Sequence, residues 1–161
     1  MFDIQLFGPL EVRTRGIVLS GDDFGGARPR HLLALLALRG GWSLVELAGT
    51  LGVTTATVKS DLAVLRDRLE PGVRDRDSVV VGRRGVFRLD PDRVHVDAAT
   101  FDQLLAVAAG RPQARAARPL AAAGVLASRP LLEDEDAPWA AEARAEYRAK
   151  MIMASAPQPI R

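Results

Sequence analysis

The sequence of 161 residues predicts an α+β fold in which a small antiparallel sheet comes first, three helices follow, and a β-hairpin closes the domain. Three patterns support this prediction. Apolar residues alternate with polar residues near the N-terminus, two helical patterns joined by a tight turn occupy residues 43–70, and apolar runs flank a Gly-Arg-Arg-Gly turn at residues 82–85. A short all-α region of helical hairpins is expected after residue 96.

The N-terminal sheet is predicted from three short apolar runs that precede residue 20. Gly8-Pro9 and Arg15-Gly16 separate these runs, and both pairs favour tight turns. Strands that alternate in this way and are joined by such short turns form antiparallel sheets. The first twenty residues are therefore expected to form a β-meander.

The first helix is predicted to lie at the centre of the core. Residues 21–26 read as a loop, and Pro29 suits the first turn of the helix that follows. The body of this helix, HLLALLAL, is apolar almost all round, as in a helix that is buried on most of its surface. Gly40-Gly41 ends the pattern and leads through Trp42 to the next helix.

The next two helices form a predicted helix-turn-helix. Ser43 and Glu46 have the S-x-x-E spacing of a capping box, and Gly52 follows where a left-handed residue would end the first helix. Thr54 and Thr55 offer hydroxyl groups for the N-terminus of the second helix. Four apolar residues at helical spacing predict its buried face: Val58, Leu62, Leu65 and Leu69.

The opposite face of the second helix is a candidate for reading DNA. It carries small and hydroxylated residues with one lysine, so it can approach base edges closely, and a lysine can donate to guanine or phosphate. An ordinary amphipathic helix pair with a solvated face is the alternative interpretation. The candidate DNA-binding residues in this segment are Thr54, Thr55, Thr57, Lys59, Ser60, Ala63 and Arg66.

A predicted β-hairpin follows in SVVVGRRGVFRLD. Arg83 and Arg84 lie at its tip between two glycines, where they can contact phosphates or enter a minor groove. A solubilising charged turn is the alternative, because hairpin tips are commonly charged. The order helix, helix, basic-tipped hairpin is nevertheless typical of a winged helix-turn-helix, and it is more specific than any of its parts.

Composition and missing motifs exclude several classes of function for this protein. The formal net charge of +2 is too small to indicate nucleic-acid binding by itself, and the lack of cysteine excludes disulfides and thiol catalysis. Two histidines, His31 and His95, lie far apart in the sequence, and neither a P-loop nor a G-x-S-x-G motif is present. We therefore expect no enzyme activity, no catalytic residue, no cofactor and no metal site. No apolar run approaches the roughly 20 residues that span a bilayer, so a cytoplasmic protein without a membrane partner is expected.

Several segments together resemble a known family. LFGPLEVRTRG, RPRHLLALLALRGG, LAVLRDRLEPG and GVFRLD are similar to segments of the actinobacterial antibiotic regulatory proteins, the SARP or AfsR-like regulators, whose first domain is an OmpR-like winged helix. VDAATFDQLLAVAAG and RPLLEDEDAPWAAEARAEYR resemble the family's bacterial transcriptional activator domain. The resemblance extends from about Phe2 to about Arg148. It implies binding to direct repeats upstream of a promoter and recruitment of RNA polymerase.

The sequence departs from the family in two places. The compact AGTLGVTTATV replaces the Trp- and Pro-containing stretch that the family usually has between its two helices, so DNA contacts do not transfer there residue by residue. The activator-type region is shortened to three predicted helices, which span Asp97–Gly110, Gln113–Ala127 and Trp139–Met151.

These observations predict three parts of the chain and one function. Residues 1–96 form the expected winged-helix DNA-binding domain, residues 97–152 a truncated activator-type region, and residues 153–161 a flexible tail. The expected protein is a sequence-specific transcriptional regulator, an activator, with double-stranded DNA as partner and with RNA polymerase and a second copy of the chain as further partners. The alternative is a winged-helix interaction module, or an anti-regulator, that does not bind DNA.

Overall fold

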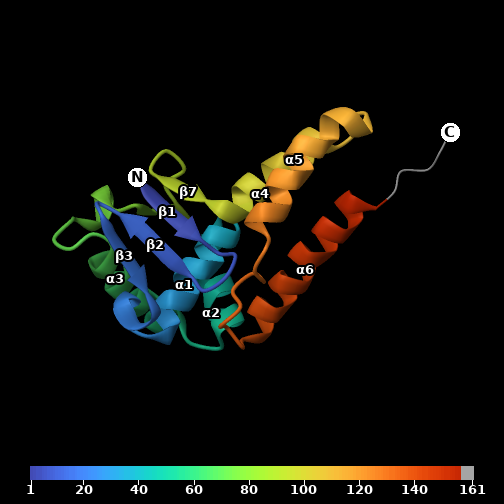
Figure 1. Ribbon diagram of the computed structural model, residues 1–161. Coiled ribbons are helices and arrows are strands. Elements are labelled where there is room, and N and C mark those ends of the chain that lie inside the picture. The colour runs from blue at the N-terminus through green and yellow to red at the C-terminus, as the bar shows by residue number, and fades with distance from the viewer. Residues whose placement is uncertain (157–161) are drawn as a thin grey trace. The chain divides into compact units, whose positions relative to one another are not determined.

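The computed structural model describes residues 1–156 and contains two compact units (Figure 1). The first unit consists of Met1–Ile4 and Leu10–Val96. The second, here called the helical unit, consists of Gln5–Pro9 together with the chain from Asp97 onward. The helical unit therefore includes a short segment from the N-terminal part of the sequence.

A mixed four-stranded sheet begins the first unit. Its strands are β1 (Phe2–Gln5), β2 (Glu11–Thr14), β3 (Ile17–Ser20) and β7 (Val94–Val96), in the order β3-β2-β1-β7. The hairpin of β2 and β3 closes through Arg15 and Gly16, which both have positive φ, as a two-residue turn of this type requires.

The prediction of a purely antiparallel sheet is corrected by β7, which pairs with β1 in parallel and sets Phe2 opposite Val94. Parallel strands need a long crossover connection. Here the crossover includes three α-helices and a hairpin, so the pairing joins residues more than ninety positions apart, far beyond the reach of local patterns.

Three helices form the body of the first unit: α1 (Ala27–Leu38), α2 (Leu44–Leu51) and α3 (Thr55–Leu69). The apolar run of α1 is buried from Leu32 to Leu36, as its sequence predicts, and α1 contacts both α2 and α3. The predicted loop at residues 21–26 contains a 3₁₀ turn, η1 (Gly21–Phe24), whose Phe24 is fully buried. A second 3₁₀ turn, η2 (Asp75–Asp77), follows α3.

A second, three-stranded sheet completes the first unit. It contains β4 (Trp42–Ser43), β5 (Val80–Arg83) and β6 (Val86–Leu89) in the order β4-β6-β5. The β5–β6 hairpin lies where the sequence predicts it. The two-residue strand β4 was not predicted, because two residues carry no periodicity.

The helical unit contains α4 (Asp97–Ala108), α5 (Gln113–Leu126) and α6 (Pro138–Ser155), close to the three predicted helices. Since α6 continues to Ser155, residues 153–155 of the expected flexible tail are helical. Residues 157–161 lie outside the described residues. Within the part of the chain that the structure describes, no helix has both the length and the apolarity needed to cross a membrane.

Segment 5–9 is held inside the helical unit by polar and aromatic contacts. The Asp97 carboxylate accepts hydrogen bonds from the backbone N–H groups of Leu6 (2.8 Å) and Phe7 (3.1 Å). The Phe7 ring makes edge-on contacts with the rings of Phe101 (centroids 5.3 Å apart) and Tyr147 (5.8 Å). Burial, followed by a hydrogen bond to Asp102, raises the pKa of Tyr147, so its hydroxyl remains a donor.

The predicted buried stripe of α3 is confirmed, and it yields a stability test. Leu62 is 2% exposed, so Leu62→Ala should lower the free energy of unfolding by about 2–5 kcal/mol, because it leaves a cavity in the core. Val45 on α2 is 73% exposed, and Val45→Ala should change the free energy by no more than about 0.5 kcal/mol. Chemical denaturation of the two variants measures both values, and equal stability would contradict the orientation of α3.

Candidate nucleic-acid interface

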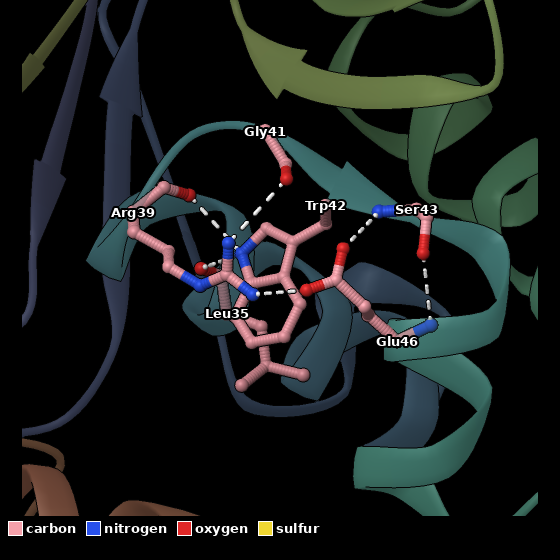
Figure 2. Close-up of polar contacts among 6 residues, drawn as sticks. All are labelled: Leu35, Arg39, Gly41, Trp42, Ser43 and Glu46. Atoms are coloured by element: carbon pink, nitrogen blue, oxygen red, sulfur yellow. Dashed lines mark hydrogen bonds and ion pairs between the residues drawn. The ribbon is translucent and has the colours of Figure 1, made fainter.

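The predicted capping box fixes the start of α2 (Figure 2). The Ser43 hydroxyl accepts a hydrogen bond from the Glu46 N–H (3.1 Å), and the Glu46 carboxylate accepts one from the Ser43 N–H (3.0 Å). Each side chain thus satisfies a backbone donor that the first helical turn leaves without a partner. The N-terminus of α2 lies where the sequence places it.

A second network, which the sequence analysis did not find, joins the end of α1 to this cap. The buried Trp42 donates its indole N–H to the carbonyl of Leu35 (2.8 Å) and to that of Arg39 (3.1 Å). The Arg39 guanidinium lies over the Trp42 ring, 3.6 Å from its centroid, and donates to the Glu46 carboxylate (2.9 Å). Figure 2 shows that the Glu46 carboxylate accepts hydrogen bonds both from the Ser43 N–H of the cap and from the Arg39 guanidinium.

These hydrogen bonds change the pKa of Glu46. Hydrogen bonds from the Ser43 backbone and then from Arg39 lower the pKa of the Glu46 carboxyl from its ordinary value of 4.5, because both favour the ionised form. The carboxylate is solvent-exposed, so the network is an ordered surface feature rather than a buried ion pair.

The turn between α2 and α3 follows the prediction. Gly52 has φ 68°, in the left-handed region, and its N–H donates to the carbonyl of Ala48. Thr54 caps α3 by accepting from the Thr57 N–H (3.2 Å), and the two threonine hydroxyls are hydrogen-bonded to each other (3.0 Å). Thr54 and Thr57 therefore position the start of α3, and Thr55 is exposed beside them.

The outward face of α3 is defined here as Ala56, Ser60, Ala63 and Asp67. All four are exposed, whereas the apolar stripe from Val58 to Leu69 is buried. Lys59 lies beside this face and is exposed, so its ammonium group is accessible. Of the predicted DNA-binding residues in α3, Ser60 and Ala63 belong to this face and Thr55 and Lys59 are exposed, whereas Thr57 and Arg66 are half-buried.

Arg66 differs from the exposed residues among these, because its guanidinium makes contacts within the first unit. Its guanidinium donates to the Val80 carbonyl from Nη2 (2.8 Å) and Nε (3.2 Å), and it lies 5.9 Å from the centroid of the Phe87 ring. The side chain is only 16% exposed. Arg66 therefore attaches the β5–β6 hairpin to α3, a contact over fourteen positions that helical spacing alone does not predict.

The tip of the hairpin presents both predicted arginines to solvent. Arg83 ends β5 opposite Val86, and the turn itself consists of Arg84 and Gly85, which have φ 53° and 76°. Gly82 lies against the Phe87 ring so closely that a Cβ there would be 2.7 Å from a ring carbon. The hairpin thus carries two adjacent, exposed arginines at a tight turn.

One buried charge on α3 also escaped the sequence analysis. Asp61 lies between the buried residues Val58 and Leu62, and its side chain is only 8% exposed. It accepts a hydrogen bond from Arg28 Nε at the start of α1 (2.8 Å). The sequence contained one signal for this buried charge, because Asp61 directly precedes Leu62 of the apolar stripe.

This arrangement of helices and sheets is, at the level of the fold, that of a SARP-like regulator. A solved structure of Mycobacterium tuberculosis EmbR, a SARP-family regulator, in complex with a low affinity phosphopeptide, is similar with a TM-score of 0.73 and 25% sequence identity. The match covers 95% of this chain and 43% of that chain, so this chain spans less than half the length of its neighbour. No protein-family model and no curated protein matches the sequence.

The likeness to the EmbR structure is one of fold, and it suggests a winged helix.

Because the pKa of Glu46 is lowered in the folded protein, its carboxylate should stabilise the fold in a pH-dependent way. The stabilising contribution of the carboxylate should be fully present above pH 4.5, the ordinary pKa. It should be lost as the pH falls towards and through the lowered pKa of the folded protein. Glu46→Gln should therefore melt at a lower temperature than the unsubstituted protein at pH 7, and the difference should shrink below pH 4.5. Melting curves at a series of pH values measure this difference, and a gap that stays constant would show that the carboxylate charge has no role.

Proposed function

We propose that the first unit is a winged helix that binds double-stranded DNA, with α3 as the recognition helix and the β5–β6 hairpin as the wing. The observation that carries this proposal is the N-terminal part of the outward face of α3, where the exposed Ala56, Ser60 and Ala63 are small or hydroxylated and Lys59 lies beside them. The buried stripe fixes this face outward, and the Thr54 cap fixes the N-terminal end that would enter a groove.

The side chains of this face suit the major groove. Ala56 and Ala63 let the helix approach base edges closely, and their methyl groups can contact the thymine methyl. Ser60 can donate or accept, and Lys59 can donate to the guanine O6 and N7 acceptors or to a phosphate. In helix-turn-helix proteins the N-terminal residues of the recognition helix make these contacts.

The wing supplies charge rather than sequence information. Arg83 and Arg84 extend from a turn that is attached to α3 through the bonds of Arg66 to Val80. Phosphate contacts of this kind set the register of a protein on DNA without reading the sequence. Arginine can also enter a narrow minor groove.

The regulatory part of the proposal rests on the resemblance and on the neighbouring structure. We assign to the chain the role of a cytoplasmic transcriptional activator that binds direct repeats in a promoter. The helical unit would contact RNA polymerase or a second copy of the chain, as the family resemblance implies. EmbR supports a regulator of this general kind.

A protein-interaction module without DNA binding is the second candidate. The formal net charge of only +2 favours it, because a DNA-binding protein must attract phosphates. Electrophoretic mobility shifts against fragments of the source genome discriminate the two candidates. For a DNA-binding winged helix, the affinity for DNA should fall steeply as the salt concentration rises from about 50 to 200 mM. An interaction module should shift no fragment.

Lys59→Ala tests the recognition helix. Loss of one base contact should weaken binding to preferred fragments by roughly 1–3 kcal/mol while leaving the melting temperature nearly unchanged, because Lys59 is exposed. Lys150→Ala in the helical unit is the control with the same change of charge. Equal affinity of both variants for preferred fragments would exclude a base contact by Lys59.

The wing arginines should behave differently from Lys59. Replacing Arg83 and Arg84 by alanine should weaken binding to all sequences alike and reduce the slope of log affinity against log salt by up to about two units. Titrations at four or more salt concentrations give the slope. A change restricted to preferred sequences would instead mean that the wing reads bases.

A further inference from the structure

The two flanks of α3 contact different parts of the first unit. With 100° per residue, the outward face from Ala56 to Asp67 lies between a flank that contains Lys59 and Arg66 and a flank that contains Asp61, Val64 and Arg68. Arg66 connects the first of these flanks to the β5–β6 hairpin, which carries Arg83 and Arg84. The basic hairpin therefore lies on one side of the outward face.

The opposite flank contacts the junction between η1 and α1. Gly25 approaches Val64 so closely that a Cβ on Gly25 would be 2.4 Å from the Val64 Cγ1. Arg68 donates to the Asp23 carbonyl (3.5 Å), and Arg28 donates from Nε to the Asp61 carboxylate (2.8 Å). Three contacts thus fix the start of α1 along this flank.

Arg28 and Asp61 differ sharply in exposure. The Asp61 side chain is 8% exposed, whereas that of Arg28 is 57% exposed. Placing a carboxylate where water is largely excluded costs free energy, and an ion pair returns that cost only in part. The pair is therefore poorly explained by stability alone, and the bond does constrain the orientation of an exposed guanidinium.

The bond leaves a useful part of the Arg28 guanidinium available. Asp61 engages Nε, and among residues 1–156 no hydrogen bond from the two terminal nitrogens is found. Those nitrogens form the fork that binds a phosphate group with two hydrogen bonds. A guanidinium held at Nε, on a side chain that is 57% exposed, thus keeps its two terminal nitrogens for a phosphate group.

We infer that Arg28, oriented by Asp61, binds a DNA phosphate on the side of the recognition helix opposite the wing. This inference rests on the proposed DNA-binding function. A helix in the major groove has a phosphate backbone at each edge of the groove, which is about 12 Å wide. The wing arginines serve one edge, and Arg28 serves the other. Arg28 is a phosphate contact, and Asp61 is a positioning residue that acts through it.

Arg28→Ala tests the phosphate contact. The slope of log affinity against log salt should be smaller for this variant than for the unsubstituted protein by about one unit. A fourfold rise in salt concentration should therefore lower the DNA affinity of the variant about three- to fourfold less than that of the unsubstituted protein. The loss should be the same for preferred and random fragments. Arg13→Ala is the control with the same change of charge, because Arg13 lies on β2 with a side chain that is 69% exposed, and it should retain the original slope.

Asp61→Ala tests the positioning role by the sign of its effect. Removing a negative charge close to DNA should tighten binding if only net charge matters. Loss of orientation should instead weaken binding, reduce the slope as Arg28→Ala does, and add little to Arg28→Ala in the double variant. Tighter binding by Asp61→Ala would overturn the positioning role.

Arg28→Lys provides a second test that does not require replacing a buried residue. A lysine has a single ammonium group, which cannot hold Asp61 and also present a fork to phosphate, so the variant should behave like Arg28→Ala. Full affinity and an unchanged slope for Arg28→Lys would overturn the orientation argument. If the unsubstituted protein binds DNA but Arg28→Ala keeps its slope, the inference fails alone, whereas no binding by the unsubstituted protein removes the proposed function itself.

Discussion

The burial of one stripe of α3 is the constraint on which the rest of the first unit depends. Val58, Leu62 and Leu65 are at most 2% exposed, so α3 cannot rotate about its axis without bringing apolar area into water. Its rotation decides which residues face outward and which form the flanks. The hairpin and the start of α1 are then attached to opposite flanks, and this arrangement decides on which side of α3 Arg28, Arg83 and Arg84 lie.

Polar contacts fix the boundaries and the relative angles of the elements, which burial alone leaves undetermined. Apolar packing has little direction, whereas a hydrogen bond sets an angle as well as a distance. The cap of α2, the Arg39–Trp42 stack and the Arg66–Val80 bonds each lie where one element ends or meets another. Their combined role is to fix the boundaries and the relative angles of elements that the core has already brought together.

The sequence predicts the local features of this fold well, because their causes lie within a few residues. The capping box of Ser43, the left-handed Gly52, the stripe of α3 and the β5–β6 hairpin are all present in the structure. Each depends on spacing along one segment. The exposed residues of the candidate site could be predicted for the same reason, because a buried face implies an opposite face.

The features that sequence analysis missed all depend on contacts between distant segments. The parallel strand β7, the internal role of Arg66 and the Arg28–Asp61 pair join residues from 14 to more than ninety positions apart. No periodicity within a single segment encodes such a partner. The same holds for the assignment of segment 5–9 to the helical unit, which a division of the chain at residue 96 does not anticipate.

The placement of segment 5–9 also determines when the protein can complete its fold during synthesis. Phe7 leaves the ribosome about 140 residues before its aromatic partner Tyr147 is made, and that interval lasts on the order of ten seconds. Until then Leu6 and Phe7 have no helical unit to enter, and their apolar side chains remain open to other contacts in the cell. Nascent chains of this protein therefore pass through an interval in which a chaperone that shields short apolar segments would have a defined target at Leu6 and Phe7.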